Sequence, residues 1–173
     1  MRDAESFDAF YAASVRRVTG QVYLMTGSQS EAADCVQEAY ARAWQRWGRV
    51  SGYDDPEAWV RTVAYRISVD TWRRAVRRRA AHLKYEPAGN LPAVSPDRVA
   101  IVDALRRIPA AQRQAIVLYH LVGLPVEQVA HETGVPTGTV KARLARGRQA
   151  LAPLLSDHPP ASDDRGRGVT NHA

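Results

Sequence analysis

Apolar side chains recur every three or four residues along the first eighty positions, which is the repeat of a helix with one buried face. Residues 7–26 follow this pattern, and Gly27 is suited to end the helix. The pattern resumes from about Ser30, where either Ser28 or Ser30 can cap the helix, and reaches Trp47. A third helix is predicted to begin at residues 55–57, where Asp can cap, Pro fits the first helical position and Glu suits the N-terminal dipole.

Two segments interrupt this pattern. Residues 48–55 contain two glycines and are predicted to form a loop. Residues 82–96 contain three prolines with a Gly and an Asn, which forbid a regular helix there. Because so long a stretch without periodicity is unusual inside a compact domain, we interpret it as a flexible linker between two domains.

Helical patterns return at Asp97 and continue in four short segments, over 97–108, 109–123, 125–133 and 136 to about 151. The chain beyond Pro153 has few apolar groups to bury, which predicts a disordered tail. No alternating strand pattern is present, so the expected fold is all-α, with two small helical domains. The predicted boundaries are 1–80 for the first domain, 81–96 for the linker, 97–153 for the second domain and 154–173 for the tail.

Charge and composition narrow the classes of function. The net charge of +6 favours a polyanionic partner. The single cysteine, Cys35, excludes an internal disulfide and fits a reducing compartment. We find no signal peptide, no apolar run of membrane-spanning length, no zinc-ligand spacing and no glycine-rich phosphate loop. We therefore expect a cytoplasmic protein without a membrane span, cofactor or metal, and not an enzyme.

The strongest local signal lies in residues 126–144. Ala130, Gly134 and Val140 have the spacing of a helix-turn-helix, where a small residue lets the helices cross, glycine makes the turn and valine packs between them. An ordinary helical hairpin with a solvated basic face is the alternative. The second helix would expose residues that reach phosphates and base edges in a major groove. These are Thr137, Thr139, Lys141, Arg143, Arg146 and Arg148.

The third helix combines arginines with aromatic residues. Cations attract the DNA backbone, and aromatic rings stack on unpaired bases. The preceding loop ends near Tyr53, which we consider as one wall of a base pocket. The alternative is that the tryptophans are core residues and the arginines a solvated helix end. The candidate DNA-binding residues of this region are Tyr53, Arg61, Arg66, Trp72, Arg73, Arg74 and Arg77.

Three stretches in this order, residues 32–44, 59–74 and 136–148, resemble the extracytoplasmic-function (ECF) group of the sigma-70 family. The likeness covers roughly residues 5–152 and is greatest to the actinobacterial branch often called SigE-like. It implies an RNA polymerase sigma factor that recognises promoter −35 and −10 elements and aids melting. The implied partners are promoter DNA and the polymerase core, through its β′ clamp coiled coil and β subunit. The sequence does not decide whether an anti-sigma factor is a further partner.

The resemblance also implies roles by position. The loop 48–55 would capture a base flipped from the −10 element, and the linker 82–96 would thread toward the RNA exit path. The arginines and Trp72 of the third helix would meet the −10 element, and Gly138 would join the −35 readers. The residues that would grip the polymerase lie on one polar face of the second helix, which in isolation is an ordinary amphipathic helix. They are Asp34, Gln37, Glu38 and Arg42.

Two positions depart from the family pattern. Asp70 stands where many members have Asn, and because an acid repels phosphate we leave it out of the DNA contacts. Cys35 replaces a usual aliphatic residue, which a small buried thiol can tolerate. Two rival classes explain less of the chain. A dimeric helix-turn-helix repressor or activator would account for residues 126–144 but not for the arginine- and tryptophan-rich helix. The second rival class is a pure interaction protein, such as an inactive sigma decoy.

Overall fold

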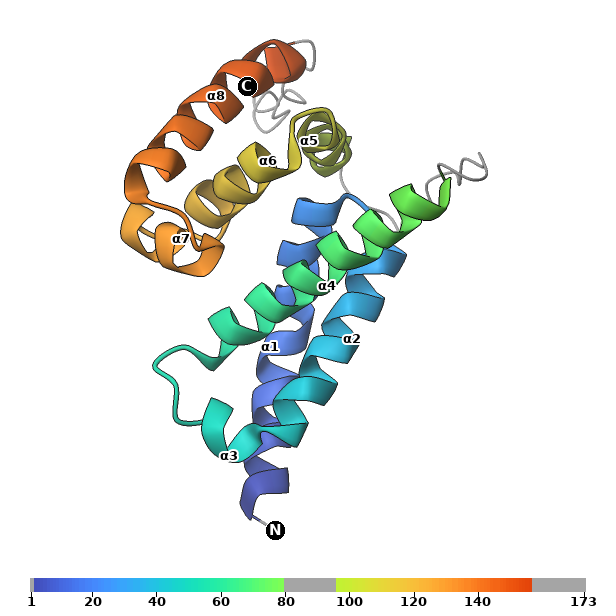
Figure 1. The fold of residues 1–173 in the computed structure, drawn as a ribbon, viewed down its shortest axis with the longest axis vertical. Helices are drawn as coiled ribbons and strands as arrows, with labels where there is room; N and C mark the ends of the chain where they lie inside the picture. Colours follow the sequence, from blue (N-terminus) through green and yellow to red (C-terminus); the bar gives the residue numbers. More distant parts are fainter. Residues whose placement is uncertain (1, 80–95, 157–173) are drawn as a thin grey trace, which may run out of the picture.

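The computed structural model describes residues 2–79 and 96–156, with their side chains over 3–74 and 99–156. Within these ranges every regular element is a helix, which confirms the predicted all-α fold. The proposed linker and tail lie largely outside the described residues. The first half of the chain forms α1 (Arg2–Thr26), α2 (Gln29–Gln45), the short α3 (Trp47–Val50) and α4 (Pro56–Arg79) (Figure 1).

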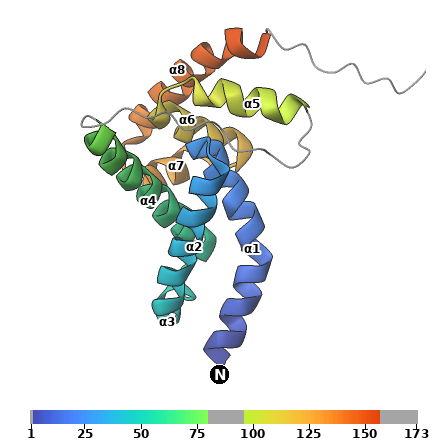
Figure 2. The same ribbon diagram turned by 90° about the vertical axis from the view of Figure 1, so that its right-hand side faces the viewer.

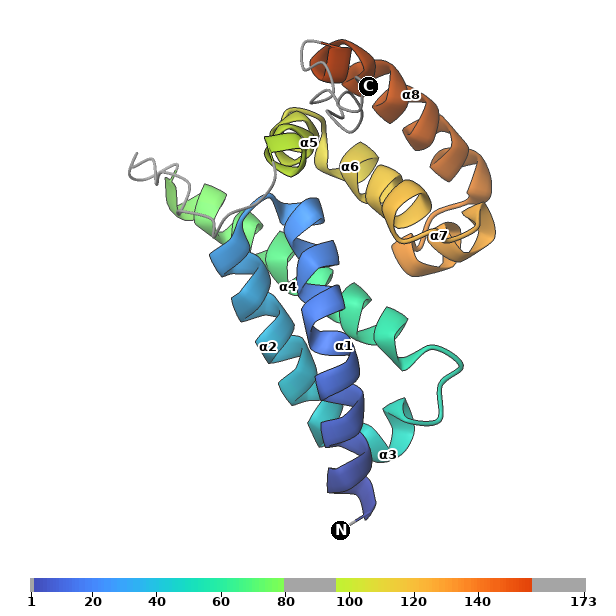
Figure 3. The ribbon, with the colours of Figure 1, turned by 180° about the vertical axis from the view of Figure 1, so that it is seen from behind.

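The first three long helices pack as a bundle. Helices α1 and α2 run side by side, and α4 crosses both of them, as Figures 1 and 3 show from opposite sides. The predicted apolar faces meet at the centre, because burying them is the main gain in free energy on folding. The fully buried side chains here include Val18, Val22, Val36, Ala39, Val60 and Ala64, each 0% exposed.

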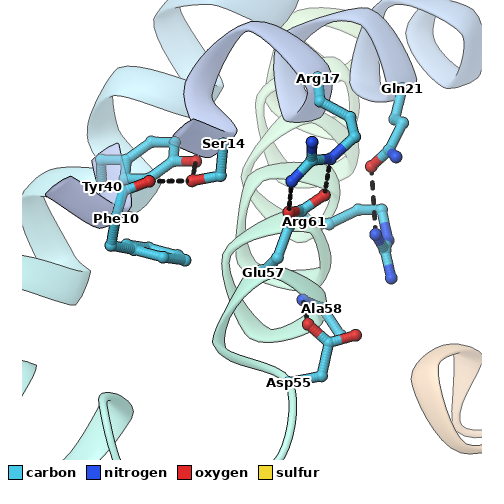
Figure 4. Close-up of polar contacts among 9 residues, drawn as sticks. All are labelled: Phe10, Ser14, Arg17, Gln21, Tyr40, Asp55, Glu57, Ala58 and Arg61. Atoms are coloured by element: carbon cyan, nitrogen blue, oxygen red, sulfur yellow. Dashed lines mark hydrogen bonds and ion pairs between the residues drawn. The ribbon is translucent and has the colours of Figure 1, made fainter. Parts of the chain in front are cut away.

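The predicted helix ends are confirmed. Gly27 adopts a left-handed φ of +80°, and its N–H donates to the Tyr23 carbonyl at 2.7 Å, which ends α1. The Ser28 hydroxyl accepts from the Glu31 N–H and caps α2. Asp55 caps α4, where its carboxylate accepts from the Ala58 N–H at 2.9 Å (Figure 4).

The second half of the chain forms α5 (Pro96–Arg106), α6 (Ala110–Ile116), a π-helical turn (Val117–Leu121), α7 (Val126–Thr133) and α8 (Thr137–Ser156) (Figure 2). Helices α6 and α8 lie closely together. Gly147 permits this approach, because a Cβ atom there would lie 2.8 Å from Cγ1 of the buried Ile116.

The structure differs from the sequence prediction at three places. Residues 48–55 are not all loop, since Trp47 and Val50 are buried and fold their segment into the turn of α3. The helix predicted over 109–123 changes to a π-helical turn, in which the Val122 N–H donates to Val117. Helix α8 does not stop at about residue 151 but continues through Pro153 to Ser156, because Leu154 still packs on the core.

The two domains share more than a linker. Helix α1 contacts α5, α6 and the π-helical turn, and α4 contacts α7. Most of the buried apolar residues of both domains belong to one connected cluster. The two helical domains therefore also contact each other directly, in a closed arrangement. No helix in the described ranges is long and apolar enough to cross a membrane.

Candidate nucleic-acid interface

Helices α7 and α8 form the predicted helix-turn-helix. Gly134 lies between them with a left-handed φ of +67°, a conformation that glycine adopts without strain. The Val135 N–H donates to the Ala130 carbonyl at 3.2 Å and completes the turn. Val129 and Val140, each 0% exposed, hold the two helices together. The spacing recognised in the sequence therefore corresponds to a real crossing of two helices.

Helix α8 presents a basic outer face. Between Lys141 and Arg148 the sequence has four cations and no acid. Residues 139 and 143 are half-buried. The remaining candidates of this helix are exposed to solvent: Thr137, Gly138, Lys141, Arg146 and Arg148. Such a face can donate hydrogen bonds to phosphates and to guanine edges.

The candidates on and near α4 do not all share one environment. Arg66, Arg73 and Arg74 are exposed, and Trp72 is 61% exposed although large aromatic side chains are usually buried. Tyr53 is half-buried in the turn after α3. The side chain of residue 77 lies outside the described part of the chain. An exposed tryptophan among arginines is suited to stacking on an unpaired base.

Arg61 differs from the other candidates because its side chain is buried, with 3% exposure. Its guanidinium forms a two-pronged ion pair with Glu132 of α7, one prong being Nε to Oε2 at 3.2 Å. The remaining Nη1 donates to Gln21 of α1 at 3.1 Å (Figure 4). In this closed arrangement Arg61 therefore connects three helices and is covered.

A cavity of about 330 Å³ lies beside this ion pair. Its α4 wall includes Arg66, Arg73 and Asp70, and Glu132 and Thr133 at the end of α7 form part of the opposite wall. The arginines that the sequence assigned to DNA thus face the second domain across a polar gap. Asp70, which is not expected to contact DNA, lines the same gap.

The polar face of α2 is exposed as predicted, at Asp34, Gln37, Glu38 and Arg42. Arg42 Nε donates to Glu38 Oε1 at 2.8 Å across one helical turn. The amide of Gln37 donates to the Tyr11 hydroxyl at 3.0 Å, which joins α1 to this face. A mixed-charge surface on a rigid helix is suited to a protein partner more than to DNA phosphates.

Buried polar contacts fix the helices that carry these faces. The Ser14 hydroxyl donates to the Phe10 carbonyl at 2.5 Å and lies 2.7 Å from the buried Tyr40 hydroxyl (Figure 4). Burial raises the pKa of Tyr40 to about 12, so the phenol stays neutral. Arg17 of α1 pairs with Glu57 in the first turn of α4, at 2.8 and 2.5 Å. Neither pair was foreseen, because no local spacing in the sequence joins these residues.

Comparison with known proteins identifies the class. Residues 10–78 match the model of Sigma-70 region 2, and residues 98–151 match that of Sigma-70, region 4. The chain therefore belongs to the sigma-70 family of RNA polymerase sigma factors. The described residues contain no cluster of three His, Cys, Asp or Glu side chains able to hold a metal ion.

Curated relatives place the chain within that family. It is 33% identical over 141 residues to the ECF RNA polymerase sigma factor SigL of Mycobacterium tuberculosis, covering 77% of this chain and 79% of SigL. It is 30% identical to SigE of Mycolicibacterium smegmatis, covering 88% of this chain but only 63% of the length of SigE. The chain belongs to the ECF group of RNA polymerase sigma factors, and SigE, whose branch the sequence resembles, is among these relatives.

Solved structures agree on the fold. The sigma factor RpoE of Bartonella quintana, solved in complex with the anti-sigma factor NepR, superposes with a TM-score of 0.79 at 24% identity. That match covers 90% of this chain and 99% of RpoE. CnrH, solved in complex with the cytosolic domain of CnrY, gives a TM-score of 0.60 at 21% identity, covering 90% of this chain and 91% of CnrH. These likenesses show a shared arrangement of helices.

Proposed function

We propose that this chain directs RNA polymerase to promoters by presenting two DNA-reading surfaces and one polymerase-docking surface. The exposed basic face of α8 reads the −35 element as duplex. The exposed side chains of α4, with the turn before it, hold the −10 element and an unpaired base. The observation that carries the proposal is the presence of the helix-turn-helix and the Trp72-bearing helix in one chain, each within a matched sigma-70 region.

The docking surface consists of Asp34, Gln37, Glu38 and Arg42 on α2. Its partner in this proposal is the polymerase core, through the β′ clamp coiled coil, with further contacts to β. Neither DNA-reading domain needs high affinity alone. Once polymerase fixes their spacing, binding of the second element becomes effectively intramolecular and gains from the high local concentration.

The chain itself catalyses no reaction in this proposal, and its location is that of RNA polymerase, the cytoplasm. An anti-sigma factor is a further proposed partner, because RpoE was solved in complex with the anti-sigma factor NepR. The proposed working boundaries remain 1–80 and 97–153, joined by the segment between them.

The deciding experiment is co-purification with core RNA polymerase followed by transcription in vitro. A tagged full-length chain should recover core polymerase in a one-to-one complex, and the complex should initiate at discrete sites on genomic fragments from the source organism. Recovery of a free dimer that binds a palindromic site without polymerase would instead favour the repressor class. Polymerase binding without initiation on any fragment would favour the decoy.

A further inference from the structure

The sequence predicts that Arg61 of α4 contacts DNA, but in the structure its guanidinium forms an ion pair with an acidic residue of the second domain. Glu132 at the end of α7 receives two of its donors and Gln21 the third. The side chains of Arg61 and Glu132 are 3% and 8% exposed. A phosphate makes the same two-pronged contact with arginine, so the Glu132 carboxylate occupies the edge of the guanidinium that a phosphate would use.

The same approach of α7 covers more than Arg61. Glu132 and Thr133 lie across the 330 Å³ cavity from Arg66 and Arg73. DNA running along this side of α4 would have to occupy the space beside the end of α7. The −35 reader is affected as well, because Arg143 of α8 is half-buried and lies near Tyr65 of α4. Burial raises the pKa of Tyr65, and the charges of Arg113 and Arg143 partly offset that rise.

A second polar contact holds the domains together at another point. Arg106 at the end of α5 donates through Nε to the Gly27 carbonyl at 2.6 Å, and through Nη2 to the same oxygen. A cation there also complements the C-terminal dipole of α1. Gly27 leaves room for it, because a Cβ atom would lie 2.7 Å from Cγ of Arg106.

The interface is nevertheless imperfectly satisfied. Arg113 of α6 lies near Tyr65 of α4 and Glu31 of α2, yet its Nε is buried without a hydrogen-bond partner among the described residues. A buried donor left unpaired costs free energy in the closed form and is hydrated once the domains part. Polar interfaces between domains also permit relative domain motion more readily than large apolar ones.

We propose that the Arg61–Glu132 ion pair is an intramolecular latch, in which a carboxylate of the second domain occupies the phosphate-binding arginine of the first. The closed chain binds DNA poorly. DNA selects the open form, and polymerase does so only by holding the two domains apart, because the α2 face is exposed in the closed form as well. This proposal rests on the proposed function, since it assigns regulation to the same α4 surface. A ligand favours one of two conformations only by its difference in affinity for them, and DNA able to use Arg61 has such a difference.

The test compares Glu132→Gln with Glu127→Gln in the full-length chain without polymerase. Both variants remove one negative charge from α7, but Glu127 is exposed and has no ion pair in the described structure. The probe is a fluorescein-labelled mixed-sequence duplex with a single-stranded end. We expect Glu132→Gln to bind it about tenfold more tightly than wild type, since the apparent affinity scales with the fraction of open chains.

The shape of the molecule gives an independent readout. Small-angle X-ray scattering should show a larger radius of gyration for Glu132→Gln than for wild type or Glu127→Gln. Equal DNA affinity and equal radius for the two variants would overturn the latch. Because Glu132→Gln leaves Arg61 without its buried counter-ion, circular dichroism must show that it retains native helix content.

Exchanging the two charges of the ion pair tests the latch even if Glu132→Gln does not fold. Arg61→Glu alone should expand the chain, whereas Arg61→Glu with Glu132→Arg should restore the wild-type radius. Failure of the swap to restore compactness, with helix content intact, would overturn the ion-pair latch. Transcription with core polymerase separates the two proposals. If wild type initiates but neither readout changes, only the latch fails, and if wild type never initiates, the proposed function fails.

Discussion

Glu38 and Arg42 pair with each other at 2.8 Å across one turn of α2, with about half of each side chain exposed. An exposed pair of this kind contributes only about 0.3–0.5 kcal/mol to the helix. The pair therefore does little to hold the fold together. It does fix two opposite charges in a defined order on the surface proposed to meet polymerase.

Reversing both charges is therefore a clean test of that surface. Glu38→Lys with Arg42→Glu keeps an ion pair on α2 but presents it in the opposite order, so like charges should meet across the interface. We expect recovery of core polymerase in a pull-down to fall at least tenfold. Thermal unfolding should change little. Wild-type recovery of polymerase by the folded double variant would remove the docking role of this face.

Lys141→Ala tests the −35 surface of α8. Lys141 is exposed on the basic face, so its removal should cost about 1–3 kcal/mol of promoter binding if it contacts a base edge, or lower the salt dependence if it contacts phosphate. Arg107→Ala is the matched control, because it removes one exposed cation from the same domain outside α8. Binding is measured by electrophoretic mobility shift with the polymerase holoenzyme. Equal losses in both variants would indicate a general effect of charge.

Much of the fold was readable from local signals. The caps at Gly27, Ser28 and Asp55 and the turn at Gly134 all act within a few residues, so a short stretch of sequence contains the whole cause. The apolar repeat likewise identified the buried faces of α1, α2 and α4. These predictions succeeded because helix formation and helix ending are local events.

The placement of polar side chains was less accessible. The sequence predicts Arg61 to be one more surface arginine, since its partner Glu132 lies 71 residues away in the sequence. The contact of Arg106 with the Gly27 carbonyl is equally distant, at 79 residues. Neither contact can be identified from the spacing of residues in the sequence. An arginine is expected at the surface unless its counter-ion is known. The closed arrangement of the domains thus became visible only in three dimensions.

Gly147→Ala should destabilise the second domain. The new Cβ would lie 2.8 Å from Ile116 Cγ1, and Ile116 is only 5% exposed and branched at Cβ, so it has little freedom to move. Overpacking typically costs about 1–3 kcal/mol, which the higher helix propensity of alanine offsets by roughly 1 kcal/mol. We expect a lower midpoint of thermal unfolding followed by circular dichroism.

Gly138→Ala provides the comparison in the same helix. Nothing lies within 4 Å of a Cβ atom at Gly138, so only the propensity term remains and the midpoint should stay equal or rise. A Gly147→Ala midpoint at or above that of Gly138→Ala would show that α6 and α8 are less tightly packed than the structure indicates.

The last prediction concerns alkaline pH and the buried thiol of Cys35. Burial among apolar residues, with Glu31 and Asp34 nearby, raises the pKa of Cys35 from 9.0 to about 11. Well below pH 9 the thiol is neutral in both states and contributes no pH dependence. Between about pH 9 and 11 the unfolded chain loses this proton more readily than the folded chain, so the free energy of unfolding falls as the pH rises.

Over pH 8 to 10 this group alone should cost on the order of 1 kcal/mol of stability. Cys35→Ala lacks the ionising group, so its free energy of unfolding, although lower overall from the lost packing, should decline less steeply over the same interval. Urea unfolding at pH 8, 9 and 10 measures both slopes. Tyr40, whose pKa is raised from 10.0 to about 12, remains in both proteins and cancels in the difference. Parallel slopes for wild type and Cys35→Ala would mean that the thiol is hydrated in the folded chain, contrary to its 4% exposure.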